Sequence, residues 1–229
     1  MSVLAKYKPS VIFLVIAGII GLVTFYLMNR VGGPPPKVEN SETELKLGSQ
    51  VWSLQNLDVT QFRNGDPIPE AKTEGEWRAF VLAGEPAWCA CETDSNGLSA
   101  FGTGKLYNFF AVSDRRKLAP EGWKIPSKDD WKQLFDMLGS ESRAGSKMKS
   151  MEGWSADAIG TNSSGFSAKP FCSRMSTGVY DNGNNSVYWW TSTGDANETA
   201  WYIALTHSGS ASKAFSHSGC GYAVRCIRE

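Results

Sequence analysis

The sequence has no excess of charge of either sign, because its 229 residues include 23 Lys and Arg and 23 Asp and Glu. This balance argues against a polybasic nucleic-acid-binding protein, which would neutralise phosphates with surplus Lys and Arg. Histidine is scarce, with two residues, and the chain contains no P-loop, no Rossmann fingerprint and no HExxH sequence. We therefore predict no catalytic residue, no metal site, no cofactor and no nucleic-acid partner.

An uncharged apolar run occupies residues 11–28. As a helix rising about 1.5 Å per residue it would be roughly 27 Å long, which nearly spans the hydrocarbon core of a bilayer. A cleavable signal peptide is the alternative, but its apolar region usually has only about 7–15 residues and ends at small residues. Here Asn29 and Arg30 follow, with no Cys of a lipoprotein signal. We expect an uncleaved transmembrane helix over residues 11–29, in contact with the lipid bilayer.

The charges that flank this run are unequal. Lys6, Lys8 and the amino terminus precede it, whereas Arg30 is the basic residue that follows closely. This bias favours a cytoplasmic N-terminus at residues 1–10 and a C-terminal domain across the membrane. Small residues also form one face of the predicted helix, which suits packing against a neighbouring helix. These residues are Ala17, Gly18 and Gly21.

Residues 30–46 form a predicted Gly/Pro-rich spacer. Three consecutive prolines at 34–36 favour an extended polyproline II segment of about 3.1 Å per residue. All nine tryptophans lie beyond residue 50, so the hydrophobic bulk of the remaining chain is aromatic. The chain has no tandem repeat. We predict one folded domain over residues 47–229.

Only one segment of this domain has strong helix signals. Ser127 and Asp130 suit a capping box, apolar residues follow at helical spacing, and Gly139 marks the end. The strand signals are short. Side chains at 201–205 alternate as those of a strand do, residues 207–212 suit a turn, and residues 222–227 suit a closing strand. The pattern predicts an α+β fold with mostly antiparallel strands.

Eight short motifs also occur in order along the domain. They are GDPI at 65–68, PAWC at 86–89, GKLYNFFAV at 104–112, LAPEGWKIPS at 118–127, AGSKMK at 144–149, Asn162 with GFSA at 165–168, WWTST at 189–193 and AVRCI at 223–227. This set resembles the Fibrobacter succinogenes major paralogous domain, a bacterial surface-protein family whose fold is similar to the C-type lectin-like fold. The resemblance covers essentially the whole of residues 47–229.

The resemblance implies an exported bacterial protein with an adhesion-like or scaffolding role and no enzyme activity. It also implies one or two helices, a small sheet and long loops held by aromatic side chains. Combined with the predicted orientation of the anchor, it places the helix in the bacterial cytoplasmic (inner) membrane and the domain in the periplasm.

Five cysteines in an exported domain suggest disulfides, and the odd number leaves at least one unpaired. The sequence alone leaves three pairings open for each choice of the free cysteine. The resemblance implies a usual pair near Cys89 and Cys226, with Cys91, Cys172 and Cys220 as additions. We expect Cys226 in a disulfide with Cys89 or Cys172.

Residues 173–198 combine Ser, Gly, Asn and Thr with aromatic residues, as adaptable binding loops do. We predict a partner-binding surface there. The alternative is that one of Trp189 and Trp190 belongs to the core, because at least one of two adjacent strand residues faces inward. The calcium-binding Glu-Pro-Asn motif of C-type lectins is missing, since Glu85-Pro86 is followed by Ala. The predicted partner-binding residues are Tyr180, Asp181, Asn182, Asn184, Tyr188, Trp189 and Trp190.

The leading hypothesis is a non-enzymatic, membrane-anchored scaffolding module, an accessory subunit that stabilises a larger membrane protein complex from its periplasmic side. One alternative is a calcium-independent binder of surface carbohydrate or matrix. Another is a copper oxidase similar to the formylglycine-generating enzymes, which would use Cys220 and Cys226. His207 and His217 lack the further ligands that a metal site needs, and we expect both to be polar hairpin residues.

Overall fold

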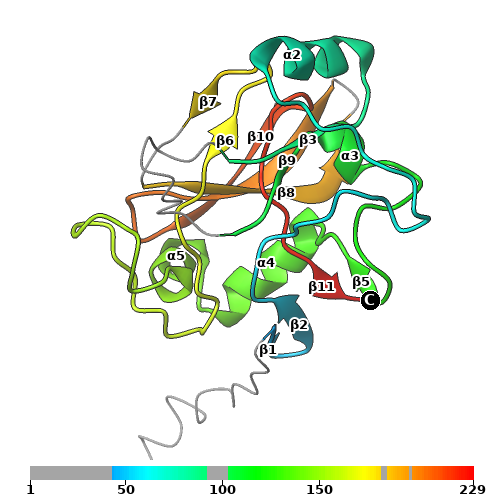
Figure 1. The fold of residues 1–229 in the computed structure, drawn as a ribbon. Helices are drawn as coiled ribbons and strands as arrows, with labels where there is room; N and C mark the ends of the chain where they lie inside the picture. The colour runs from blue at the N-terminus through cyan, green and yellow to red at the C-terminus, as the bar shows by residue number, and fades with distance from the viewer. Residues whose placement is uncertain (1–42, 92–102, 182–184, 196–197) are drawn as a thin grey trace, which may run out of the picture. The chain divides into compact units, whose positions relative to one another are not determined.

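The computed structural model describes residues 43–91, 103–181, 185–195 and 198–229 (Figure 1). The predicted transmembrane helix at 11–29, its small-residue face and most of the spacer lie outside these residues, as do Asn182 and Asn184. Within the described ranges, no helix is long and apolar enough to cross a membrane. All described residues belong to one compact unit, Val38–Glu229.

Short strands and a few helices make up this unit. The helices among the described residues are α2 (Glu74–Ala83), α3 (Phe109–Val112), α4 (Lys128–Met137) and α5 (Glu141–Met148). The strands are β1 (Glu44–Leu47), β2 (Gln50–Ser53), β3 (Trp88–Cys89), β4 (Leu106–Tyr107), β5 (Trp123–Lys124), β6 (Ser173–Arg174), β7 (Tyr180–Asp181), β8 (Val187–Gly194), β9 (Thr199–Leu205), β10 (Ala211–His217) and β11 (Ile227–Arg228).

The strands form small sheets in which neighbouring strands are antiparallel. A four-stranded sheet has the order β1-β2-β11-β5, a three-stranded sheet has the order β10-β9-β8, and the pairs β3-β4 and β6-β7 complete the set. Ile227 in β11 pairs with both Trp52 and Lys124, so the last strand joins segments from the first half of the domain. This confirms the predicted mixture of helices and short antiparallel strands.

Two predicted boundaries differ from the structure. The fold begins at Glu44, within the predicted spacer, because β1 pairs with β2 from Glu44↔Ser53 to Leu47↔Gln50. The predicted closing strand at 222–227 is a strand only at Ile227–Arg228, although Tyr222 and Ala223 form isolated bridges to Tyr107 and Trp189. The predicted alternation at 201–205 lies within β9.

The helix α4 begins where the sequence predicts it. Ser127 Oγ accepts from the Asp130 N–H at 3.1 Å, and Asp130 Oδ2 accepts from the Ser127 N–H at 2.8 Å. These two bonds form the expected capping box, which satisfies backbone donors of the first helical turn. Trp131, Leu134 and Phe135 then form the buried face of the helix.

The expectation of one or two helices is too low. The helix α2 has its own capping box, formed by Thr73 and Glu76, and it ends at Gly84 in the left-handed conformation with φ 66°. Its apolar pattern is weak because Trp77 is its only buried residue. The capping box, the Gly84 end and the buried Trp77 side chain hold this helix in place. Amphipathic periodicity in the sequence therefore does not reveal it.

Strand β8 of the three-stranded sheet is covered on both faces. On one face, Trp189 stacks on Trp131 of α4, with ring centroids 5.7 Å apart. On the other face, Trp190 packs edge-to-face on Phe109 of α3 at 5.4 Å. Figure 1 shows α3 above β8 and α4 below it. Successive side chains of a strand point to opposite faces, so the adjacent tryptophans enter two different clusters of buried residues.

Close packing of α5 against the segment before β10 gives a stability prediction. A Cβ added at Gly145 would lie 2.5 Å from the backbone carbon of Ser210, whereas one at Gly75 in α2 would meet nothing closer than 4.0 Å. Gly145→Ala should lower the free energy of unfolding by about 1–3 kcal/mol because backbone must move. Gly75→Ala, the matched control, should raise it by up to about 1 kcal/mol through helix propensity. Urea denaturation followed by tryptophan fluorescence measures both, and stabilisation by Gly145→Ala would contradict the packing.

Candidate functional site

The two tryptophans of the predicted partner-binding surface are core residues. Trp189 and Trp190 are both 0% exposed. Each indole N–H also has an acceptor: Trp189 Nε1 donates to Asn56 Oδ1 at 2.8 Å, and Trp190 Nε1 donates to the Tyr107 carbonyl at 2.9 Å. The prediction that they bind a partner is therefore wrong. The physical reason is that both faces of β8 are covered, which strand alternation alone does not reveal.

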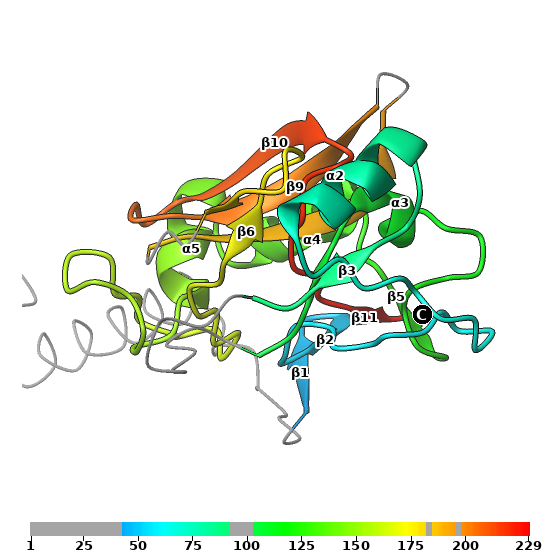
Figure 2. The same cartoon turned by 45° about the horizontal axis from the view of Figure 1, so that its top comes forward.

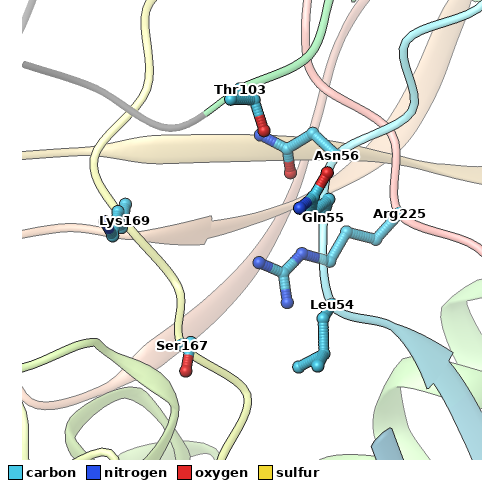
Figure 3. Close-up of a pocket in the computed structure, with 7 residues that line it drawn as sticks. All are labelled: Leu54, Gln55, Asn56, Thr103, Ser167, Lys169 and Arg225. Atoms are coloured by element: carbon cyan, nitrogen blue, oxygen red, sulfur yellow. The ribbon is translucent and has the colours of Figure 1, made fainter. Parts of the chain in front are cut away.

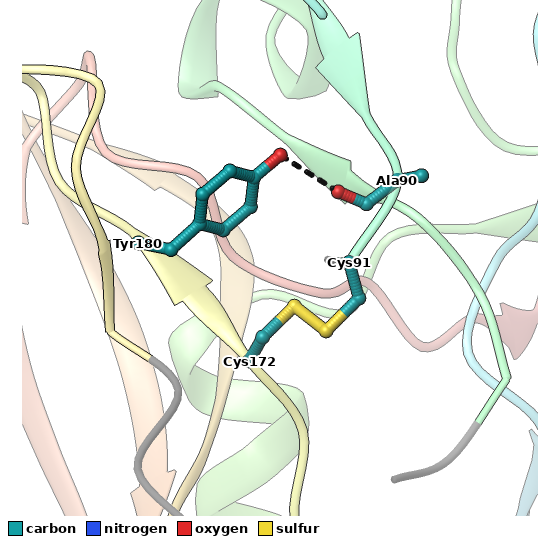
Figure 4. The surroundings of a disulfide bond; sticks show 4 residues. All are labelled: Ala90, Cys91, Cys172 and Tyr180. Atoms are coloured by element: carbon teal, nitrogen blue, oxygen red, sulfur yellow. Dashed lines mark hydrogen bonds between the residues drawn. A yellow bond between two sulfur atoms is a disulfide. The ribbon is translucent and has the colours of Figure 1, made fainter. Parts of the chain in front are cut away.

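The remaining predicted residues do not form one surface. Tyr188 is half-buried and stacks on Tyr222 at 5.3 Å, on the Trp190 face of the sheet. Tyr180 is half-buried on β7, where its hydroxyl donates to the Ala90 carbonyl at 2.9 Å (Figure 4). Asp181 is exposed beside it. Of the predicted partner-binding residues that the structure describes, Asp181 is therefore the one exposed to solvent.

The disulfide joins Cys91 to Cys172, whose Cα atoms are 5.9 Å apart across 81 residues of sequence (Figure 4). The expected bridge from Cys226 to Cys89 or Cys172 is therefore wrong. Neither Cys89 nor Cys226 forms a disulfide, and the two are buried in different clusters of the core. A disulfide needs Cα atoms within about 7 Å, and only the tertiary fold decides which cysteines meet that limit.

Cys220 and Cys226 do not provide the features of a redox metal site. Burial raises the pKa of the Cys226 thiol to about 12, so the protonated, unreactive form dominates at neutral pH. Cys220 is half-buried, and its Sγ accepts from Ser216 Oγ at 3.3 Å. Among the described residues, no group of three or more His, Cys, Asp or Glu could hold a metal ion. His207 follows β9 and His217 ends β10, so strand β10 separates the two.

A polar cavity of about 350 Å³ gathers segments that are far apart in the sequence (Figure 3). Arg225 extends into it from the segment before β11, and Lys169 lies on the opposite side in the view of Figure 3. The lining residues are Leu54, Gln55, Asn56, Thr103, Ser167, Lys169 and Arg225. Among the described residues this lining has two basic side chains and no acidic one, so it favours a negatively charged or hydrogen-bond-accepting ligand.

Arg225 is the residue that gives this cavity its electrostatic character. It is only 4% exposed, and its guanidinium lies 4.2 Å from the centroid of the Phe166 ring. Burial lowers the pKa of this guanidinium to about 9, because desolvation penalises the charged form. Sequence reasoning missed it, although one arginine within the apolar motif at 223–227 is a recognisable signal of a buried cation.

Comparison with known proteins identifies the family of the domain. The family model described as the Fibrobacter succinogenes major domain matches residues 45–228. Comparison with curated proteins and with solved structures gives no match.

The observed disulfide predicts a specific peptide map. Digestion without reduction should yield one disulfide-linked pair, with Cys91 in one peptide and Cys172 in the other, while Cys89, Cys220 and Cys226 are recovered as thiols. Reduction should lower the free energy of unfolding by about 2–4 kcal/mol, because it releases a long loop in the unfolded chain. A linked peptide that contains Cys226 would contradict the structure.

Burial of the Cys226 thiol predicts a dependence of stability on pH. Between about 8.5, the pKa of an ordinary thiol, and about 12, the unfolded chain has lost this proton and the folded chain keeps it. The free energy of unfolding should therefore fall across this range by up to about 1.4 kcal/mol per pH unit from this group. Denaturant titrations of the wild type and Cys226→Ala at several pH values measure it. Equal slopes in both proteins would contradict the burial of the thiol.

Proposed function

This chain belongs to the Fibrobacter succinogenes major domain family, and from its structure we propose that it is a non-enzymatic module that binds another protein. We further propose that its fold is C-type lectin-like. The few helices, the small antiparallel sheets and the long irregular segments held by aromatic side chains support this assignment.

We propose that residues 11–29 anchor the domain in the bacterial cytoplasmic membrane, with the N-terminus in the cytoplasm and the domain in the periplasm. The uncharged run at 11–28 and the basic residues before it support this orientation. The short spacer at 30–43 would hold the domain near the membrane surface. This arrangement suits an accessory subunit of a larger membrane protein complex, to which Ala17, Gly18 and Gly21 would contribute a helix-packing face.

The observation that carries protein binding is the open edge of the three-stranded sheet. In the described part of the chain, β10 pairs with β9 alone, and Figure 2 shows it at the outer edge. Phe215 on β10 is 63% exposed and packs edge-to-face on Trp201 at 5.8 Å. An edge strand offers unpaired backbone groups, and an exposed aromatic ring offers an apolar anchor. Together they provide a surface on which an extended segment of a partner could pair.

A calcium-independent carbohydrate or matrix binder remains the second candidate. The observation that favours it is the polar cavity around Asn56, whose amide and neighbouring hydroxyl groups are the kind of donors and acceptors that recognise sugars. The cavity and the edge of β10 are separate features, so the two candidate functions respond to different variants.

Co-purification tests the edge of β10. Phe215→Thr removes the aromatic ring and keeps strand propensity, and we expect it to reduce the recovered partner about tenfold, as loss of an interface anchor does. Leu82→Gln is the matched control, because Leu82 is 84% exposed on α2 and the change keeps helix propensity. The full chain is extracted in mild detergent, and the associated proteins are quantified by mass spectrometry.

Equal recovery from Phe215→Thr and the wild type would contradict the proposed edge, and loss with Leu82→Gln would place the contact on α2. A glycan array probed with and without EDTA examines the second candidate. Saturable glycan binding that Phe215→Thr leaves unchanged would favour that candidate over protein binding.

A further inference from the structure

Three buried cations of this domain form no ion pair with a carboxylate of the described residues. They are Lys149, Arg174 and Arg225, and each is at most 4% exposed. In two of them, backbone carbonyls accept the N–H groups. Lys149 Nζ donates to the Ser208 carbonyl at 2.7 Å, and Arg174 donates from Nε to Gly178 at 2.8 Å and from Nη1 to Ala71 at 2.9 Å. These two cations are explained as structural residues.

Arg225 differs because its hydrogen bonding is incomplete. Its Nη1 donates to the Phe166 carbonyl at 2.7 Å, but no described residue accepts from its buried Nε. Among the described residues, the other buried side-chain nitrogen without a partner is Trp131 Nε1, which does not line the cavity. A buried donor without an acceptor is costly, and it is costlier on a charged group. Among the described residues the guanidinium therefore has the Phe166 carbonyl as its acceptor, and it lines the cavity without a carboxylate partner.

The cavity wall is held in place by its own hydrogen bonds. The Trp189 indole can only donate, so its bond to Asn56 fixes the amide oxygen toward Trp189 and leaves the NH₂ group as the available donor of Asn56. Ser167 adopts φ 54°, and the Asn162 side chain bonds both its N–H and its hydroxyl at 2.9 Å. Donors that are fixed before a ligand arrives lose little entropy on binding.

We propose that this cavity binds a carboxylate group, with Arg225 as its principal partner and with Lys169 and the Asn56 amide as further donors. A guanidinium presents parallel N–H groups that match the two oxygens of a carboxylate. The volume of about 350 Å³ has room for a small organic acid or for an acidic group of a larger ligand. The ligand would place a negative charge beside a guanidinium that has no carboxylate partner among the described residues and whose pKa burial has lowered.

Two indole signals test the proposal. The ¹⁵N-labelled full chain in detergent is titrated with acetate, and then with succinate, at constant ionic strength with chloride as the replaced anion. The Trp189 indole signal should shift and saturate, because its acceptor Asn56 lines the cavity. The Trp190 indole donates to Tyr107 on the other face of the sheet, so its signal should not shift.

Variants of the lining residues locate the binding. Asn56→Asp keeps the acceptor of Trp189 but replaces the donor by a negative oxygen, and it should abolish the response. Lys169→Gln should lower the affinity about two- to fivefold, the effect of an exposed ion pair. Lys72→Gln, the matched control on an exposed lysine outside the cavity, should leave the affinity unchanged. Arg225→Lys keeps the charge, loses the planar fork and should weaken binding at least about tenfold.

If Arg225→Lys does not fold, Asn56→Asp and Lys169→Gln decide the result. The proposal is wrong if the Trp189 signal does not saturate, if Lys72→Gln weakens binding as much as Lys169→Gln, or if phosphate saturates the site and acetate does not. Saturation by acetate and succinate alone would show that the cavity binds carboxylates of small molecules that are not attached to a protein. Competition between acetate and a co-purified protein would show that the carboxylate belongs to a partner.

Discussion

The burial of Trp189 and Trp190 on opposite faces of one strand is the constraint on which the rest of the domain depends. Burying both rings requires that other residues cover both faces of β8. Trp131 and Phe166 cover one face, and Phe109 and Tyr222 cover the other. Each indole N–H also needs an acceptor. The fold meets both needs with segments from distant parts of the sequence, and this brings the loop at Asn56 against the sheet.

The same aromatic core determines how cations are buried. The Arg174 guanidinium lies 4.9 Å from the Trp77 ring centroid and 4.5 Å from that of Tyr180, while Lys149 Nζ lies 4.5 Å from that of Trp154. Ring faces and backbone carbonyls replace carboxylates as partners. Because these cations join α2 to β7 and α5 to the segments around it, they stabilise long irregular connections that have few backbone ladder bonds of their own.

The two candidate surfaces follow from this construction. The edge of β10 is open because the sheet ends at this strand, which pairs only with β9 among the described residues. The cavity at Arg225 exists because the loop after β2, the residue Thr103 and the segment at 167–169 meet around one guanidinium (Figure 3).

The family, the capping box and buried face of α4, a strand at 201–205 and the α+β character could all be predicted from the sequence, because they depend on the order of residues within short segments. The packing of the whole chain was needed to show that Trp189 and Trp190 are both buried, that Cys91 rather than Cys226 pairs with Cys172, and that Arg225 lines a cavity. Alternation along a strand predicts which side chains share a face, but it does not predict which other residues cover that face. Disulfides and cavities depend on distances between residues such as Cys91 and Cys172, which are 81 positions apart and which only the packed chain brings together.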